Sequence, residues 1–246
     1  MSIFSKLKSD DLQKAQDRLG GGFQALPSDI YTVTIKAMYV NTSKSGAMGI
    51  TLLGSVEGQP NEYRETFWVT NKDGLNYFVN KQDNKTKIPL PGFTIVDDIC
   101  VVCTDAPLAD QEPEEKVLNI YDAEAGKEMP KSVQVITSLT GKKVALAIQD
   151  ELHNKTVKDG DKYVDTAETI ERNAVVKVFH PEYKVTVLEA TEGREATFWD
   201  KWLERYKTGK PVDRRKIKEE GQAGRPPKAT PTAASPAPRK SLFGNK

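Results

Sequence analysis

Cysteine and histidine are scarce in this chain of 246 residues, which contains two of each. Cys100 and Cys103 stand too close together for a disulfide scaffold, and their spacing suits a redox or zinc motif instead. A zinc site needs four ligands, however, and only His153 and His180 remain as candidates. The two valines between the thiols indicate a buried segment, so we expect both cysteines to be core residues.

Catalytic residue patterns are also missing. Neither histidine lies near a serine or cysteine nucleophile motif, which gives no support to triad catalysis. Asp97, Asp98 and the acidic run 110–115 lack the spaced carboxylates or histidines of a two-metal nuclease. The triple glycine at 20–22 is not followed by Gly-Lys-Ser/Thr, so we interpret it as a linker and not a phosphate loop. We therefore expect no enzyme activity, no metal site and no cofactor.

No run of about 18 apolar residues occurs, so no membrane span is expected. Residues 1–13 have no apolar segment after their lysines, which argues against a secretory signal and for a cytosolic protein. Residues 1–206 hold 25 Lys and Arg against 32 Asp and Glu, whereas residues 207–246 hold 11 against 3. Because an acidic body carries a basic tail, a nucleic-acid site in the body has to be a local basic strip.

Alternating residues predict three consecutive antiparallel strands in the first half of the chain. In residues 29–40 one face is expected to carry Tyr31, Val33, Ile35, Ala37 and Tyr39. Residues 48–57 form the second strand, which Gly54 interrupts with a bulge or a sharp bend. The third strand begins at Glu62.

The stretch 62–78 is the most informative part of the sequence. The period of two places Tyr63, Glu65, Phe67 and Val69 on a core face, and Arg64, Thr66, Trp68 and Thr70 on the other face. Asn71–Gly74 predicts a tight turn, after which the chain returns through 75–79. A cation and an indole on one sheet face suit a single nucleic-acid strand. The alternative is an amphipathic hairpin whose Trp68 covers a neighbouring loop.

The remaining segments extend this pattern. Helical spacing predicts a helix at 93–104, and a helix or turn is expected at 132–139. Residues 80–87 are expected to form a loop, residues 116–121 a short strand, 142–152 and 174–180 two further strands, and 185–188 an edge strand. Three strands, a helical insertion and two strands is the order of an OB-fold, a five-stranded barrel that binds oligonucleotides. A generic small β-barrel or an α+β sandwich gives the same pattern.

The predicted organisation is mainly β with helices. Residues 1–22 form an amphipathic helix and a glycine linker, and residues 23–190 form the OB-like domain. Residues 191–206 contain an amphipathic helix that docks on the barrel or serves as a partner interface. Residues 207–246 are a disordered, basic Pro/Ala-rich tail, and Leu242 and Phe243 at its end are interpreted as a short docking peptide.

Candidate nucleic-acid contacts combine aromatic stacking with phosphate-binding cations. Trp68 and Tyr77 are expected to stack on bases, with Tyr39 as a further ring. The expected phosphate contacts are Lys36, Lys44, Arg64, Lys72, Lys143 and Lys177.

The run GAMGITLLGSVEGQPNEYRETFWVTNKDGLNYFVNKQDNKTKIPLPGF, the later RNAVVKVFHPEYKV and both chain ends resemble single-stranded DNA-binding replication proteins of lytic tailed phages. The resemblance covers roughly residues 20–190. It implies an OB-type core that coats single-stranded DNA in replication, recombination and repair, in the cytoplasm of the infected bacterium. It also implies a tail that contacts a polymerase, a sliding clamp or another replication or transcription protein.

The tail departs from that resemblance, because bacterial single-stranded DNA-binding proteins end in an acidic peptide and this tail is basic. It therefore contacts either DNA or an acidic protein surface. A protein-interaction adaptor acting through the helix 196–206 and the tail is the alternative function. The sequence does not distinguish binding of RNA from binding of single-stranded DNA, because no residue is identifiable that would contact a 2′-hydroxyl.

Overall fold

The computed structural model describes residues 25–122, 125–160 and 162–216, and their fold is mainly β. Eight of the strands form one sheet, in which β10, β8, β1, β2 and β3 follow one another, β7 joins β1, β6 joins β7, and β9 joins β8. The expected segments at 1–22 and in the tail, with Leu242 and Phe243, lie outside the described residues. Within these residues, none of the helices is both long enough and apolar enough to span a membrane.

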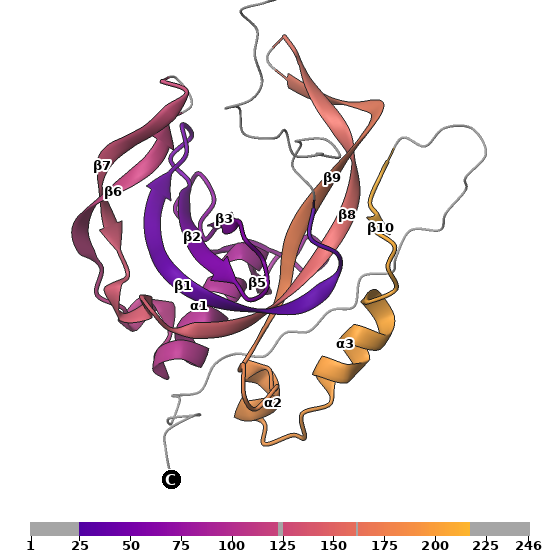
Figure 1. The fold of residues 1–246 in the computed structure, drawn as a ribbon. Coiled ribbons are helices and arrows are strands. Elements are labelled where there is room, and N and C mark those ends of the chain that lie inside the picture. The colour runs from indigo at the N-terminus through magenta and orange to yellow at the C-terminus, as the bar shows by residue number, and fades with distance from the viewer. Residues whose placement is uncertain (1–24, 123–124, 161, 217–246) are drawn as a thin grey trace, which may run out of the picture.

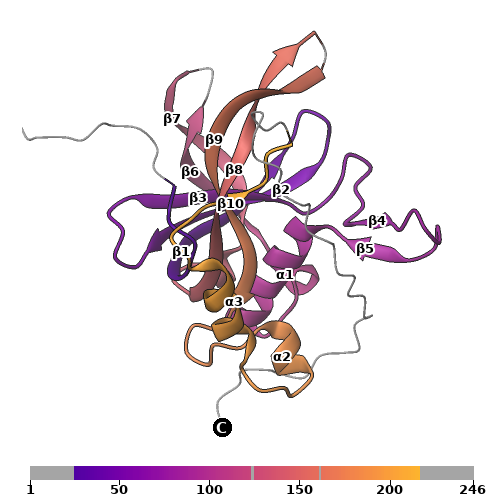
Figure 2. The ribbon, with the colours of Figure 1, turned by 90° about the vertical axis from the view of Figure 1, so that its right-hand side faces the viewer.

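The predicted three-stranded meander is confirmed. It consists of β1 (Asp29–Thr42), β2 (Met48–Val56) and β3 (Glu62–Trp68), paired antiparallel in sequence order. Its inner face packs against helix α1 (Pro91–Thr104), which matches the predicted helix and carries buried Ile95, Val96 and Ile99. Figure 2 shows α1 below the meander, so the outer face of the meander points the opposite way.

The expected alternation along β1 is wrong after Ile35, because the register of β1 against β2 shifts between Ile35 and Ala37. The extra residue, Lys36, is exposed, and beyond it the two faces exchange. Met38 is thereby buried against α1, whereas Ala37 and Tyr39 point to the outer face. Gly54 pairs with Ile35 directly opposite this bulge, where an added Cβ would come within 2.6 Å of the Val33 side chain.

The return strand expected at 75–79 does not pair with β3. Strand β4 (Tyr77–Val79) pairs instead with β5 (Lys87–Pro89) in a second hairpin, and the loop expected at 80–87 is confirmed up to residue 86 as the turn of that hairpin. The cause is the turn, because the Asn71 side chain accepts hydrogen bonds from the amides of Asp73 and Leu75, both at 2.9 Å. This side-chain turn leads the chain away from β3.

Two long hairpins rise beside the meander (Figure 1). One consists of β6 (Glu114–Asp122) and β7 (Lys127–Val135), so the helix or turn expected at 132–139 is limited to the 3-10 turn η2 (Thr137–Leu139). Another 3-10 turn, η1 (Leu108–Asp110), follows α1. The other hairpin consists of β8 (Lys143–Asp159) and β9 (Lys162–Phe179). We call its outer part, from Glu151 to the paired Arg172, the arm. Apolar residues of β6 and β7 pack over Ala37 and Tyr39.

The C-terminal part of the described chain packs on the face of β8 that points away from helix α1. The edge strand expected at 185–188 is instead α2 (Val187–Thr191), which begins at a capping box made by Thr186 and Glu189. The predicted amphipathic helix is α3 (Phe198–Tyr206), and its Trp202 is buried against Ala145, Ala147 and Phe179. Strand β10 (Val212–Asp213) then pairs in parallel with β8.

The expected closed barrel is corrected, because the sheet is open between β3 and β9. In place of a strand ladder, one side-chain hydrogen bond joins these strands, from the Val175 amide to a Glu65 carboxylate oxygen at 3.4 Å. Helix α1 packs against both strands and covers the opening from the inner side.

Candidate nucleic-acid interface

The outer face of the meander carries the residues that the sequence indicated on β3. Phe67 and Val69 are buried in the core, Glu65 faces the same way, and Arg64 and Trp68 are exposed on the opposite side, so the predicted division is confirmed. The Trp68 side chain has 44% of its surface exposed. The division follows from the period of two in an undistorted strand.

A polar ladder fixes the centre of this face. The Asn41 side-chain amide donates to the Thr51 hydroxyl at 3.0 Å, and Thr51 and Thr66 share a hydrogen bond of 2.8 Å. These residues come from β1, β2 and β3 in turn, so the ladder crosses the meander. Such cross-strand pairs stabilise a sheet and keep its surface rigid.

Arg64 lies beside this ladder and donates from Nη2 to the Tyr39 hydroxyl at 2.9 Å. Tyr39 itself is only 2% exposed, because the β6–β7 hairpin covers its ring. The expected base-stacking role of Tyr39 is therefore corrected, since its ring has no accessible face. Its hydroxyl instead positions a guanidinium that faces solvent in the described structure.

Trp68 lies at the end of the face next to α1. An added Cβ on Gly49 would stand 3.0 Å from the indole ring, so the ring packs directly over a glycine of β2. An added Cβ on Gly92 would come within 2.4 Å of the Trp68 carbonyl oxygen, so the first turn of α1 abuts the Trp68 backbone. Gly92 is required for this close approach of two backbones, and Gly49 leaves room for the indole ring.

Lys44 and Lys72 flank the Trp68 end from two loops. The Lys44 loop is closed by a hydrogen bond from the Ala47 amide to the Ser43 hydroxyl at 2.9 Å. An added Cβ on Gly46 in this loop would lie 3.8 Å from the Lys72 carbonyl oxygen, so the two loops are neighbours. Both lysines are exposed. The structure thus brings two of the expected phosphate-binding cations to the end of the face that holds Trp68.

The β4–β5 hairpin continues from this end. Tyr77 is half-buried, and the Lys87 ammonium lies 4.5 Å from its ring centroid in a cation–π contact. One face of the Tyr77 ring is therefore already occupied by Lys87. Phe78 and Lys87 are exposed residues that were not among the expected contacts. The turn at Asn71 was predicted, and the missed signal is Asp83, whose side chain accepts from the Lys85 amide at 2.9 Å and closes the turn between β4 and β5.

Lys36 and Lys143 lie toward the opposite end of the face. Lys143 of β8 pairs with Thr34 of β1, Thr34 pairs with Ser55 of β2, and Ser55 pairs with Glu62 of β3. These four residues therefore form one row across the sheet. The Lys36 ammonium binds the Glu62 carboxylate at 3.0 Å, with both side chains about half exposed. An exposed ion pair of this kind is weak, so Lys36 can exchange Glu62 for another anion at small cost.

Lys177 is separated from the other expected contacts. Its ammonium binds the Asp98 carboxylate of α1 at 3.0 Å, and Asp98 is buried. Because Lys177 points to the inner side of the sheet, where α1 packs, its expected role in phosphate binding is corrected to a structural one. No local pattern indicates this pair, because its members are 79 positions apart.

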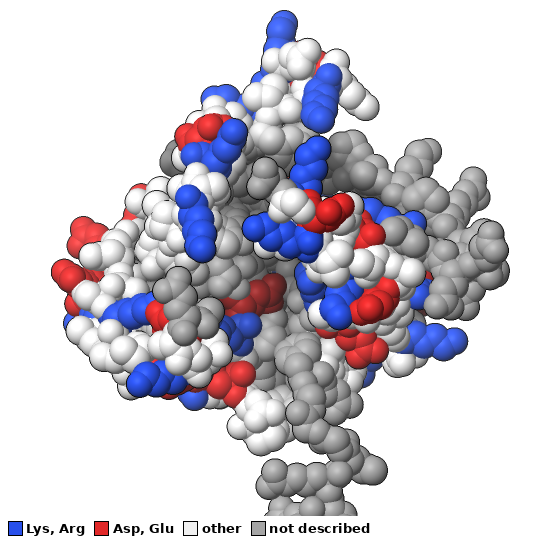
Figure 3. All heavy atoms as spheres, turned by 90° about the horizontal axis from the view of Figure 1, so that it is seen from above, with Lys and Arg blue, Asp and Glu red and all other residues white. Residues whose placement is uncertain are grey.

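Seen from above, the space between the hairpins is hollowed, with Lys and Arg along its rims and some Asp and Glu between them (Figure 3). Cations of the two long hairpins are paired within their own hairpin, such as Lys131 with Asp122 at 2.7 Å and Lys155 with Glu168 at 2.8 Å. Lys36 of the meander face is paired in the same way with Glu62, so both surfaces carry cations whose weak partners an anionic ligand can replace.

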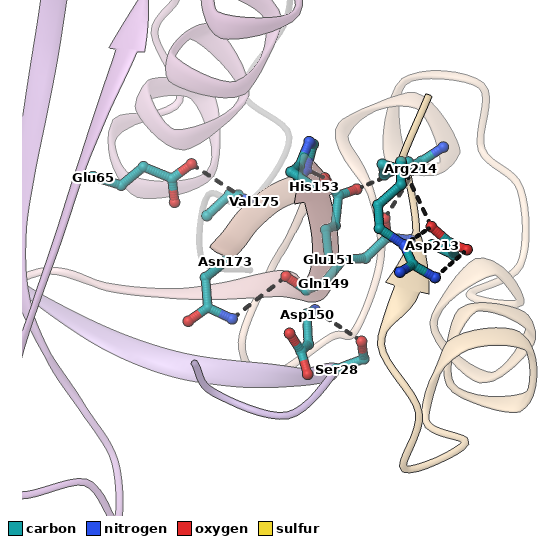
Figure 4. A network of polar contacts seen from close by, with 11 residues as sticks. Ser28, Glu65, Gln149, Asp150, Glu151, His153, Asn173, Val175, Asp213 and Arg214 are labelled. Atoms are coloured by element: carbon teal, nitrogen blue, oxygen red, sulfur yellow. Dashed lines mark hydrogen bonds and ion pairs between the residues drawn. The ribbon is translucent and has the colours of Figure 1, made fainter. Parts of the chain in front are cut away.

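A separate polar network holds the base of the arm (Figure 4). The buried Glu151 carboxylate contacts His153 Nε2 at 2.7 Å and Arg214 Nε at 3.0 Å, and Arg214 also donates to Gln149 at 3.3 Å. The Asn173 side chain bonds both the amide and the carbonyl of Leu26 at 2.8 Å. These contacts are satisfied within the fold and join the arm to both ends of the described chain.

The two thiols are core groups, as expected. Cys100 is fully buried and Cys103 partly so, and burial raises the pKa of Cys103 to about 12 and that of Cys100 further. Thiols with raised pKa values are poor nucleophiles.

Comparison with models of known protein families, with curated proteins and with solved structures finds no match to this chain.

Proposed function

We propose that this protein is a sequence-tolerant, non-enzymatic binder of single-stranded DNA. The strand lies along the outer face of the meander, from Trp68 past Arg64 toward Lys36 and Lys143. A base stacks on Trp68, and the cations contact phosphates. The observation that carries the proposal is the exposed indole of Trp68 on the same face as the positioned guanidinium of Arg64.

The order of the elements supports an OB-type core. Strands β1, β2 and β3, helix α1 and strands β8 and β9 follow the OB order, with β4–β5 and β6–β7 as added hairpins. In that fold the ligand crosses the face of the second and third strands, which is where Arg64 and Trp68 lie. The open seam between β3 and β9 is then a local departure, bridged by Glu65.

The resemblance to phage replication proteins assigns the strand to DNA replication, recombination and repair in the host cytoplasm. On this proposal the basic tail is a separate contact, to a polymerase, a sliding clamp or another replication or transcription protein. The alternative adaptor function depended partly on helix α3, but the buried Trp202 shows that much of its apolar stripe packs on β8. The helix is thus part of the folded domain.

The test is a fluorescence-anisotropy titration of labelled oligo-dT with the full chain and with a chain ending at Lys216, which keeps β10. We expect salt-sensitive binding that survives the truncation. Loss of binding with the tail would contradict the proposal and favour the adaptor. Labelled oligo-rU measured in parallel tests the choice of DNA, because equal or tighter binding of RNA would reject it.

A further inference from the structure

The β4–β5 hairpin is attached rigidly to the end of the proposed binding face. At its base the Leu90 amide donates to the Asn76 carbonyl at 2.9 Å, and two residues later Gly92 abuts the Trp68 backbone. The preceding turn is closed by Asn71, whose amide donates to the Leu75 carbonyl at 2.8 Å. A ligand that reaches Trp68 therefore meets a fixed extension of the surface.

This hairpin exposes more apolar surface than its size explains. Phe78 is 47% exposed, Leu75 before the hairpin is 41% exposed, and Val79, on the opposite face of β4 from Phe78, is 43% exposed. Phe78 pairs with Ile88 on one face of the hairpin, whereas Tyr77 and Lys87 lie on the other. The Tyr77 ring is occupied by Lys87 on one face, so Phe78 is the more available ring of the two.

The segment that carries Phe78 has a net positive charge, which favours an anionic ligand. Between residues 71 and 90 the chain carries Lys72, Lys81, Lys85 and Lys87 against Asp73 and Asp83, in a body whose net charge is negative. Asp83 is engaged by the amides of Lys85 and Thr86, so it caps its own turn. An exposed ring with surrounding lysines suits nucleic-acid bases and phosphates, and is unsuited to a basic or strongly apolar protein partner.

We propose that Phe78 is a second base-stacking residue, and that the β4–β5 hairpin extends the single-strand site beyond Trp68. This inference rests on the proposed function. Phe78 stands two residues, about 7 Å, from Asn76 at the hairpin base. Leu90 opposite Asn76 is two residues from Gly92, which abuts the Trp68 backbone. A strand leaving Trp68 therefore passes the hairpin, where Lys72 at the base and Lys81 and Lys85 at the tip contact its phosphates.

The test compares Phe78→Ala, Phe78→Leu and Phe78→Tyr in the full chain, with labelled oligo-dT of 4 and 20 nucleotides. We expect Phe78→Ala to weaken binding of the longer oligonucleotide by about 5- to 150-fold, which is the range for one stacked base. Phe78→Tyr should retain affinity and Phe78→Leu should not, because only an aromatic ring stacks. The 4-nucleotide strand should be affected less, since it can occupy the Trp68 end alone.

The matched control is Tyr163→Ala, which removes an aromatic ring that is 73% exposed near the tip of the arm. This change should leave affinity unchanged. If the wild-type chain binds oligo-dT but Phe78→Ala binds as tightly, the inference fails and the proposed function stands. If Phe78→Leu binds as tightly as wild type, the contact is apolar and involves no stacking, and the inference is likewise rejected. Absence of wild-type binding rejects the proposed function itself.

Discussion

Glu65 on β3 accepts a hydrogen bond from the amide of Val175 on β9, at 3.4 Å. The two strands do not pair as a backbone ladder in the described sheet, so this contact spans the opening between them. The Glu65 carboxylate also accepts a short hydrogen bond from the Tyr63 hydroxyl. One partly buried carboxylate thus bridges two strands that a row of backbone hydrogen bonds would join in a closed sheet.

Glu65 should make stability depend on pH. Burial is the main cause that raises the pKa of Glu65 above its ordinary value of 4.5. Below pH 4.5 the carboxyl is protonated in both folded and unfolded chains. Above pH 4.5 the unfolded chain loses its proton first, so the folded state loses stability until the raised folded pKa is passed. Glu65→Gln, which removes this titration, should therefore gain stability relative to wild type as pH rises.

Urea unfolding at pH 4.5, 6 and 7 measures this difference. Glu57→Gln, at an exposed position beyond the end of β2, is the matched control and should show no such trend. A constant difference in free energy of unfolding between Glu65→Gln and wild type across these pH values would contradict a raised pKa at Glu65.

Lys177→Ala should destabilise the fold without weakening nucleic-acid binding. The change leaves the Asp98 carboxylate buried without its ammonium partner, at a cost of about 2 kcal/mol, because the lysine is only partly buried. Lys36→Ala breaks an exposed pair and should cost less than about 1 kcal/mol. Unfolding curves and oligo-dT titrations measure both. A loss of affinity with unchanged stability in Lys177→Ala would return Lys177 to the interface.

Trp68→Ala should reduce single-stranded DNA affinity by about 1–3 kcal/mol and leave the fold intact, because the ring is half exposed and stacks on one base. Trp68→Phe should lose less, since it retains an aromatic ring. Anisotropy titration gives the affinities, and circular dichroism checks the fold. Unchanged affinity in Trp68→Ala would remove Trp68 from the site.

Arg64→Ala should alter the salt dependence of binding. Removing one phosphate contact reduces the slope of log affinity against log salt by about 0.7 for a single strand. Titrations at four salt concentrations give the slope. Arg205→Ala, which removes an exposed cation on α3 that is not among the proposed contacts, should leave the slope as in wild type. Equal slopes for Arg64→Ala and wild type would show that Arg64 contacts no phosphate.

Trp202→Ala should destabilise the domain by about 3–5 kcal/mol, because it opens a cavity between α3 and β8. Phe198→Ala on the same helix removes a partly exposed ring and should cost much less. Chemical denaturation of the two variants gives the comparison. An unchanged midpoint in Trp202→Ala would mean that α3 contributes nothing to the folded domain, and the adaptor function would regain its helix.

Local alternation and helical spacing were enough to predict the meander, helix α1 and helix α3. These signals act over a few residues, so they appear directly in the sequence. The division of β3 into a core face with Phe67 and an outer face with Arg64 and Trp68 followed from the same rule. The turn at Asn71–Gly74 was predicted, but the pairing of β4 with β5 was missed because β5 has three residues and its turn is closed by the Asp83 side chain, which the alternation of apolar residues does not show.

The sequence by itself determined the strands of the meander and which residues of β3 face solvent, because a strand's period of two is a property of the local backbone. The tertiary structure alone decided that Tyr39 is covered, that Lys177 pairs with Asp98, and that Glu65 bridges an open seam. A bulge at Lys36 exchanges the faces of β1, and each of these three contacts joins residues at least 25 positions apart. Such contacts depend on how whole elements pack, and a local pattern carries no record of them.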